Sequence, residues 1–265
     1  MRKSRMPLGL AAALVATMAP AGPPTQGAGQ GDHYMSPWRT PWTYEGPRGS
    51  DHWAELDPLY AACGGKAQSP IDIRATHKST LPALRVAYKA DVINYVTNNG
   101  HTIRVNYPPG NGNFLFVGNR GYELTQFHFH RPSEEYIHGK PYDMVLHLMH
   151  VARDGEVLGL AVLLKSGQAN AVIAQLFEHM PRTEGQTPTD GLRIDPAGML
   201  PGDLRSYYTY VGSQTAPPCT EQVRWIILKI PATVSTGEIA AFAKLYPHDA
   251  RALQPLNNRI IEESR

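Results

Sequence analysis

The stretch Gln126-Phe127-His128-Phe129-His130 decides the fold, because its polar and aromatic side chains alternate. A β-strand turns successive side chains to opposite faces, so His128 and His130 share one face and the two phenylalanines share the other. The pattern predicts a strand with a hydrophobic core on its aromatic side. Two imidazoles buried side by side need partners, and a metal ion is one that both can share.

A second run, Val145-Leu146-His147-Leu148-Met149-His150, has the composition of a neighbouring strand. Such a strand can bring His147 to the point that His128 and His130 share. Three neutral imidazoles leave a fourth tetrahedral position open, which is typical of a catalytic zinc site. We therefore expect Zn²⁺ at these three histidines. His150 has odd spacing from His147 and should lie outside the ligand set.

Length and composition indicate one sheet-rich domain. The chain has 265 residues, of which 42% are hydrophobic and 18% charged, and it contains 24 glycines and 23 prolines. Such a chain can bury one large core or two small ones. No repeat or linker divides the region after the first 41 residues, so we expect a single domain over residues 42–265.

Strand-like runs separated by turn clusters recur in this region, and helical patterns are few. The expected strands cover residues 84–88, 92–96, 102–107, 114–117, 122–130, 144–151, 157–165 and 223–230. Helical patterns occupy residues 170–178 and 236–245, the second preceded by Ser235 and followed closely by Glu238. The predicted fold class is mainly β with peripheral helices.

The first residues resemble a signal for export. Three basic residues precede an apolar run at residues 6–18, and small residues with Pro20 follow it. This apolar run is too short to span a bilayer, so we expect residues 1–21 to be a signal peptide and predict no membrane span. Cleavage after Ala21 fits an Ala-Pro-Ala pattern, with Ala19 and Ala28 as alternatives. The expected location is periplasmic or secreted.

The charge of the exported chain argues against nucleic acid as a partner. Loss of residues 1–21 removes three basic residues and no acidic ones, which leaves 22 basic against 23 acidic residues. There is also no basic block or stripe. Residues 22–41 are rich in glycine, proline and glutamine, and we expect a flexible lead-in there.

The chain has two cysteines, Cys63 and Cys219. In an exported chain the economical interpretation is one disulfide, and the alternative is two buried free thiols. Loop-closure entropy would make an unstrained bridge between them worth roughly 3–5 kcal/mol.

Seven short motifs stand in the order in which α-class carbonic anhydrases have them, and on these motifs the chain resembles that family. The motifs are Gln68–Ile73, Asn98–His101, Gln126–His130, Ser133-Glu134, Leu146–Leu148, Gly212–Cys219 and Gln254–Arg259. The resemblance runs from about Trp42 to Ile261. Exported bacterial members are most similar, since they also pair a cysteine near residues 61–65 with one after a Pro-Pro.

The resemblance implies a central twisted, mostly antiparallel sheet and reversible hydration of carbon dioxide to bicarbonate by zinc-bound hydroxide. The three histidines are then the zinc ligands. Thr215 resembles the hydroxyl that accepts a hydrogen bond from the hydroxide and passes its own hydrogen to Glu134. His101 resembles the proton shuttle, with a pKa suited to transfer near neutrality.

The resemblance also implies a pocket for carbon dioxide. Val157 and Trp225 resemble its apolar walls. Met149 stands where the family commonly has valine, and Gln214 and Ala216 replace the leucine and threonine on either side of the key threonine. These departures bear on the rate more than on the fold.

The residues behind the ligands, Gln126 and Glu135, also differ in part from the family. The family's Met-Glu-Leu-His reads Met144-Val145-Leu146-His147 here, so the carboxylate that holds the third ligand is missing. Its Ser-Glu-His reads Ser133-Glu134-Glu135. The two changes indicate an exchange in which Glu135 becomes the hydrogen-bond acceptor for His147. The alternative is a solvent-facing Glu135 with His147 satisfied by water.

Two other classes of protein fit part of the pattern. His128-x-His130-x-x-x-Glu134 fits the first motif of cupins, which bind iron or manganese, but no second cupin motif surrounds His147. A catalytically weak or inactive carbonic-anhydrase-like binding protein is the other alternative, which Val145 favours and the three histidines oppose. The predicted partner is a small molecule, carbon dioxide or bicarbonate, and a homodimer is left open.

Overall fold

The computed structural model describes residues 40–265, so the expected signal peptide and most of the expected lead-in lie outside the described residues. The strands are β1 (Asp72–Ile73), β2 (His77–Ser79), β3 (Leu84–Ala87), β4 (Asp91–Val92), β5 (Tyr95–Asn98), β6 (Ile103–Asn106), β7 (Phe114–Val117), β8 (Arg120–His130), β9 (Tyr136–Ile137), β10 (Met144–Ala152), β11 (Val157–Ser166), β12 (Gly185–Pro188), β13 (Arg193–Ile194), β14 (Tyr207–Ser213), β15 (Glu221–Val234) and β16 (Glu262–Ser264). The helices are α1 (Trp53–Leu56), α2 (Ala171–Glu178) and α3 (Thr236–Ala243), with 3₁₀ turns η2 (Gly46–Arg48), η3 (Pro58–Gly64) and η4 (Pro196–Met199). Within residues 40–265 no helix is both long and apolar enough to cross a membrane.

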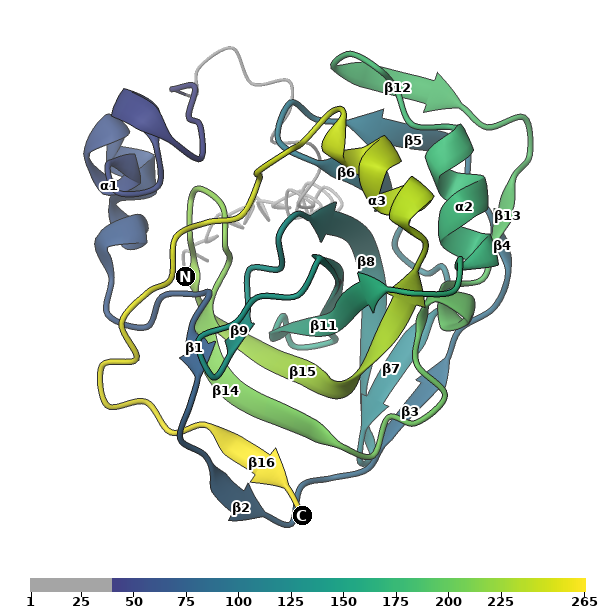
Figure 1. Cartoon of the computed structure of the whole chain (residues 1–265). Coiled ribbons are helices and arrows are strands. Elements are labelled where there is room, and N and C mark those ends of the chain that lie inside the picture. Colours follow the sequence, from purple (N-terminus) through teal and green to yellow (C-terminus); the bar gives the residue numbers. More distant parts are fainter. Residues whose placement is uncertain (1–39) are drawn as a thin grey trace, which may run out of the picture. The chain divides into compact units, whose positions relative to one another are not determined.

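One large mixed sheet of 12 strands organises the described part of the chain. Its strand order is β12-β5-β6-β8-β10-β11-β15-β14-β16-β2, and β7 joins β8 to β3. Most neighbours are antiparallel, while β11 with β15 and β16 with β2 are parallel. Figure 1 shows the two ends of this sheet on opposite sides of the view, β12 at the top and β2 at the bottom. The prediction of a mainly β fold on a twisted, mostly antiparallel sheet is confirmed.

The alternation in β8 places its aromatic side chains in one large core. Tyr122, Leu124, Phe127 and Phe129 are all fully buried in the same cluster. Two of these positions are even and two are odd. They share a face because the pairing of β8 with β10 shifts at Thr125, and a bulge of one residue reverses the parity of the alternation.

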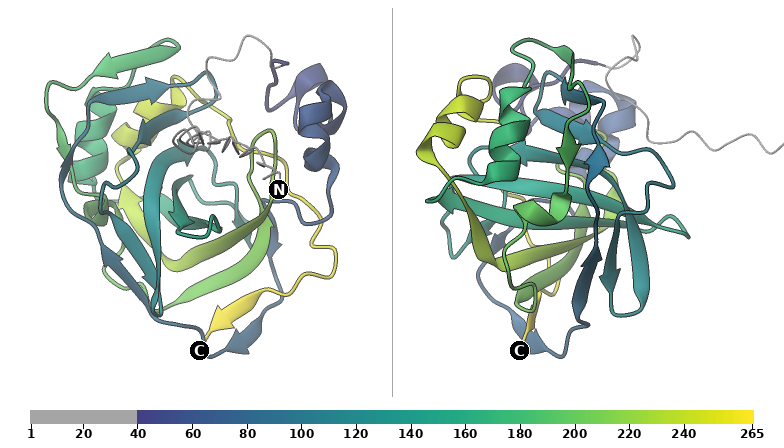
Figure 2. Two further views of the ribbon diagram at one scale, coloured as in Figure 1. Left: turned by 180° about the vertical axis from the view of Figure 1, so that it is seen from behind. Right: turned by 90° about the vertical axis from the view of Figure 1, so that its right-hand side faces the viewer.

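Helices α2 and α3 cover the side of the sheet that carries this core (Figures 1 and 2). Phe177 of α2 and Phe242 of α3 lie 5.1 and 6.1 Å from the ring of Phe129, measured between ring centroids. As the sequence indicates, α3 begins with a capping box, in which the side chains of Ser235 and Glu238 each accept the other's main-chain N–H. His128 and His130 alternate with the phenylalanines of β8, so they face the other side of the sheet.

The other face of the sheet carries a smaller apolar cluster. Its buried members are Ile71, Ile73, Val145, Met149, Ala161, Leu163, Tyr210, Val223, Trp225, Ile227 and Ile261. Strand β10 contributes to both clusters, with Leu146 and Leu148 in the large core and Val145 and Met149 in the small one. His147 stands between these last two on the same face, so it lies at an apolar floor.

The expected strand at residues 92–96 is wrong as a single element. Val92 ends β4, which pairs with β13, whereas Tyr95 begins β5, which pairs with β12 and β6. Between them the N–H of Ile93 donates to the carbonyl of Leu192. The two halves have different partners, so they form two separate strands. The long strand β14 and the shorter strands β1, β2, β9, β12, β13 and β16 are absent from the expected strands.

Candidate metal centre

Three histidines from the two central strands converge on the second face of the sheet. His128 and His130 come from β8 and His147 from β10, and His147 is the register partner of His128. One ring nitrogen of each lies within 4.8 Å of the other two. The ring centroids are 4.9 to 5.3 Å apart. The structure thus brings together the three residues that the sequence predicts as ligands.

The second nitrogen of each imidazole has its own acceptor. The pairs are His128 Nδ1 with Gln126 Oε1 at 2.8 Å, His130 Nδ1 with the Asp249 carbonyl at 2.7 Å, and His147 Nε2 with Glu135 Oε1 at 2.9 Å. A carbonyl or carboxylate oxygen only accepts, so these nitrogens carry the hydrogens. The lone pairs of the opposite nitrogens are then left for a metal.

The ring nitrogens that face the centre of the cluster are available as metal ligands. His130 Nε2 and His147 Nδ1 are buried and have no hydrogen-bond partner. A buried imidazole lone pair without a partner costs free energy, which metal binding recovers. Three nitrogen ligands with an open fourth position fit Zn²⁺, the metal that the sequence predicts here.

The electrostatics separate the third histidine from the other two. Burial lowers the pKa of His128 and of His130 well below the ordinary value, and the neighbouring imidazoles add to this effect. Burial also lowers the pKa of His147, but the charge and hydrogen bond of Glu135, together with the charge of Glu134, raise it overall. Burial therefore favours the neutral, metal-binding form of the two β8 histidines, whereas the two carboxylates favour the protonated form of His147.

Glu134 lies fully buried beside the three histidines. Its Oε1 accepts the main-chain N–H of Arg251 at 2.8 Å, and its Oε2 lies 3.5 Å from His130 Nε2 and 3.8 Å from His147 Nδ1. Burial raises the pKa of Glu134 to about 7, and the nearby Thr215 hydroxyl is among the groups that lower it. The predicted pair of Thr215 and Glu134 thus meets next to the metal centre.

His101 lies on the wall of the site, one aromatic ring away from the ligands. Its ring stacks on Trp42 with centroids 3.6 Å apart, and the ring of Tyr44 lies 6.4 Å from both His101 and His130. Burial lowers the pKa of His101 to about 4, against the opposing charge of Glu184. The expected pKa near neutrality is wrong for this arrangement, because Trp42 replaces water on one face of the imidazole.

The apolar floor contains Trp225, which the sequence predicts, and Gly159, which was not identified from the sequence. Trp225 lies 4.7 Å from His147 between ring centroids. Gly159 is the register partner of both Met149 and Trp225, and a Cβ added to it would lie 2.6 Å from the indole. The missing side chain makes room for that indole. Val157 stands two residues earlier in β11 and packs against the same cluster.

The loop that carries Thr215 is closed at its base. The N–H of Gln214 donates to the Thr220 carbonyl, and the N–H of Cys219 donates to the Ala216 carbonyl, each at 2.9 Å. The predicted disulfide between Cys63 and Cys219 is confirmed, and it joins this loop to a segment 156 residues earlier.

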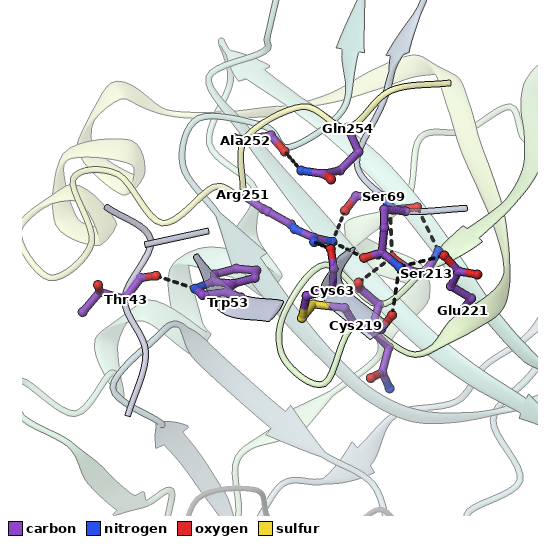
Figure 3. The surroundings of a disulfide bond; sticks show 12 residues. Thr43, Trp53, Cys63, Ser69, Ser213, Cys219, Glu221, Arg251, Ala252 and Gln254 are labelled. Carbon is purple, nitrogen blue, oxygen red and sulfur yellow. Dashed lines mark hydrogen bonds between the residues drawn. A yellow bond between two sulfur atoms is a disulfide. The ribbon is translucent and has the colours of Figure 1, made fainter. Parts of the chain in front are cut away.

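Arg251 joins this disulfide to Glu134 beside the metal centre, and Figure 3 shows its side chain next to Cys63 and Ser69. Its buried guanidinium donates to the carbonyls of Cys63 and Ser69 and to the side-chain oxygen of Gln68, at 3.1, 2.7 and 2.8 Å. Its main-chain N–H holds Glu134. Most of these contacts end on main-chain atoms, which any residue type supplies, so the sequence carries no signal for them.

His150 lies outside the cluster, as its spacing predicts. Its Nε2 pairs with the Tyr88 hydroxyl at 2.6 Å, and the two rings stack. Burial lowers the pKa of His150 to about 3. It is a neutral histidine of the large core rather than a ligand.

Known proteins match this chain over most of its length. The family model for eukaryotic-type carbonic anhydrase matches residues 48–265. A carbonic anhydrase of Neisseria gonorrhoeae is 39% identical over 226 residues, covering 84% of this chain and 88% of the relative. One from Nostoc sp. is 36% identical over 230 residues, covering 84% and 86%.

A solved structure shows the same fold. The α-carbonic anhydrase from Thermovibrio ammonificans, in complex with the inhibitor sulfanilamide, has a TM-score of 0.79 and 38% identity. The likeness covers 86% of this chain and 100% of that one. The sheet, the three converging histidines and these matches agree, and the chain belongs to the eukaryotic-type, or α-class, carbonic anhydrase family.

Proposed function

We propose that the chain catalyses the reversible hydration of carbon dioxide to bicarbonate and a proton, with Zn²⁺ held by His128, His130 and His147. The observation that carries the proposal is the convergence of three ring nitrogens whose opposite nitrogens are already held. When bound there, Zn²⁺ supplies a Lewis acid that lowers the pKa of a coordinated water to about 7, a value known from this enzyme family itself.

Thr215 and Glu134 orient the nucleophile. The Arg251 N–H occupies one oxygen of Glu134, and the Thr215 hydroxyl is near enough to interact with the carboxylate. A hydroxyl has one hydrogen, so a Thr215 that donates to Glu134 can only accept from the attacking water or hydroxide. That hydrogen bond turns the lone pair of the nucleophile toward carbon dioxide.

The apolar floor receives the substrate. Carbon dioxide has no net dipole, so a surface built from Trp225, Met149 and Val157 suits it better than a polar one. Gln214 and Ala216 flank Thr215 on the loop between β14 and β15.

His101 carries the proton away. With its ring stacked on Trp42 and a pKa of about 4, it accepts a proton poorly at neutral pH. The accepting state is therefore one in which the ring leaves Trp42 for water, where an imidazole has a pKa of about 6.5. Rotation about the side-chain bonds of one half-buried residue is enough for this change.

We also propose that the chain is exported to the periplasm or secreted. The basic, apolar and small residues at its start support a signal peptide over residues 1–21. The Cys63–Cys219 disulfide supports an oxidising compartment. A homodimer stays a prediction, which sedimentation equilibrium would check.

The alternatives lose their basis. The cupin alternative is wrong, because the chain belongs to another family. The catalytically weak binding protein rested on Val145, the position where a carboxylate is missing, yet Glu135 lies 2.9 Å from His147. A carboxylate is therefore available to the third ligand from elsewhere.

Stopped-flow hydration of carbon dioxide, measured beside zinc analysis of the same preparation, tests the proposal. We expect one zinc per chain and hydration that a chelator abolishes and added Zn²⁺ restores. Zinc-loaded protein without hydration activity would instead identify a binding protein on this fold.

A further inference from the structure

We propose that Glu135, in the loop after β8, is the positioning residue of the third metal ligand. In this role it takes the place of the carboxylate that the family resemblance implies at position 145, where this chain has valine. The inference rests on the proposed function only for the presence of a metal at the three histidines. It concerns which group fixes the ring of His147 and how the chain tolerates Val145.

The contact between Glu135 and His147 is direct and dry. Glu135 Oε1 lies 2.9 Å from His147 Nε2, and both side chains are fully buried. A carboxylate oxygen is the acceptor in such a pair, so the hydrogen of His147 is on Nε2 and the lone pair is on Nδ1. His147 then offers Nδ1 to the metal, whereas His128 and His130 offer Nε2 because their Nδ1 atoms are held.

The main chain at Glu135 is itself held in place. The buried hydroxyl of Ser133 donates to the Glu135 carbonyl at 2.8 Å and accepts the N–H of Tyr142 at 2.8 Å. The N–H of Ser133 donates back to the Tyr142 carbonyl at 3.1 Å. Strand β9 begins at the next residue and pairs with β1, so the loop is fixed on both sides of Glu135. A carboxylate held this way can set the orientation of a ring rather than follow it.

Val145 occupies the place where a carboxylate would no longer be tolerated. It lies two residues before His147 on the same face of β10 and is fully buried in the small apolar cluster. A carboxylate at position 145 would compete with Glu135 for the one N–H of His147. The carboxylate without this hydrogen bond would be a buried charge without a partner, which is strongly destabilising. Glu135 and Val145 are therefore one exchange rather than two separate changes.

Because of this exchange, carboxylates from one loop lie beside both ring nitrogens of the third ligand. Glu135 holds Nε2 of His147, while Glu134 Oε2 lies 3.8 Å from its Nδ1. The two carboxylates are consecutive, yet one orients the ligand and the other faces the hydroxyl of Thr215.

Zinc affinity tests the exchange without any assay of hydration. In Glu135→Gln a neutral amide replaces the carboxylate at nearly the same shape, and we expect zinc binding in chelator competition to weaken about 10–100-fold. Glu178→Gln, which removes an exposed carboxylate from α2, should bind zinc like the wild type. The double variant Glu135→Gln/Val145→Glu should recover at least part of the lost affinity.

The tautomer of His147 in the zinc-free protein gives a second readout. Nitrogen-15 NMR should find its hydrogen on Nε2 in the wild type and a more even mixture of tautomers in Glu135→Gln. Unchanged zinc affinity in the single variant would overturn the role of Glu135, and a double variant as weak as the single one would overturn the exchange. A wild type that binds zinc tightly but does not hydrate carbon dioxide would overturn the proposed function and leave this inference standing.

Discussion

The main-chain N–H of Arg251 lies 2.8 Å from Glu134 Oε1, although 117 residues separate the two in the sequence. The guanidinium of the same arginine holds the Cys63 carbonyl. A displacement of the disulfide therefore reaches the carboxylate beside the metal through a single buried residue, as well as through the loop that follows Thr215.

Reduction of the Cys63–Cys219 disulfide should lower both stability and activity. Loop-closure entropy gives a loss of roughly 3–5 kcal/mol in unfolding free energy, because the bond closes a loop of 156 residues. Urea unfolding with and without reductant measures this loss. A fall in carbon dioxide hydration activity at urea concentrations too low to unfold the reduced protein would report the displacement of Thr215. In Cys63→Ser/Cys219→Ser the reductant should have no effect. Equal stability of the oxidised and reduced wild type would contradict the prediction.

His130→Ala should lose zinc and hydration together. The variant keeps the β8 ladder but removes one of three ligands, and two imidazoles hold Zn²⁺ far more weakly than three. Metal analysis after dialysis, with hydration measured on the same sample, checks this. His150→Gln is the matched control, since that histidine pairs with Tyr88 outside the cluster and should leave the zinc content unchanged.

Trp42→Ala should raise the pKa of His101 from about 4 toward the ordinary value of about 6.5. Removal of the stacked indole exposes the imidazole ring to water, and solvation by water favours the charged form of the ring. Proton NMR titration of the imidazole measures the shift.

His101→Ala should slow the transfer of the proton to solvent and so lower turnover in dilute buffer. The step that converts carbon dioxide to bicarbonate should keep its rate, and added imidazole should restore turnover. If His101→Ala keeps full turnover in dilute buffer, another group carries the proton.

Gly159→Ala should disturb the apolar floor. The new Cβ would lie 2.6 Å from the Trp225 indole, so the indole must shift. We expect a loss of about 1–3 kcal/mol in unfolding free energy, typical of overpacking, and slower hydration with unchanged zinc content. Gly202→Ala is the control, because nothing lies within 4 Å of a Cβ at that position. A wild-type rate in Gly159→Ala would show that the indole does not shape the substrate pocket.

Stability should fall on acidification, in part because of His150. Its pKa is about 3 in the folded chain and about 6.5 when unfolded. Between these values the unfolded state binds a proton that the folded state refuses, so the unfolding free energy decreases as the pH falls from about 6.5 toward 3. Urea unfolding of zinc-free protein at several pH values measures the slope. His150→Gln should show a shallower slope, and an identical slope would remove His150 from the account.

The strands that could be predicted are those whose side chains alternate against a core. β8 and β10 are examples, and the three histidines follow from them because ligand spacing repeats strand spacing. Strands β2 and β16 could not be predicted in this way. They are short and polar, and they exist because Glu262 and Glu263 pair with His77 and Lys78 across the length of the chain. Pairing of this kind leaves no local pattern.

Contacts of the site that are made by side chains could be predicted from the sequence, whereas contacts made by main-chain atoms could not. The contact of Glu135 with His147 could be expected because two changed residue types indicated it. The acceptor for His130 is the main-chain carbonyl of Asp249, which any residue would supply. The pKa of His101 depends on Trp42, which comes from a distant segment, and only the folded chain brings the two rings together.

Pairing of β8 with β6 and β10, and of β10 with β11, fixes the positions of the imidazoles. Glu134 and Glu135, in contrast, come from the connection that leaves β8. The sheet thus places the imidazoles, whereas the two carboxylates that lie beside them come from a short loop. A protein engineer could graft a different three-residue insert at Ser133–Glu135 and retune the acidity of the centre while the sheet, and with it the position of the metal, is retained.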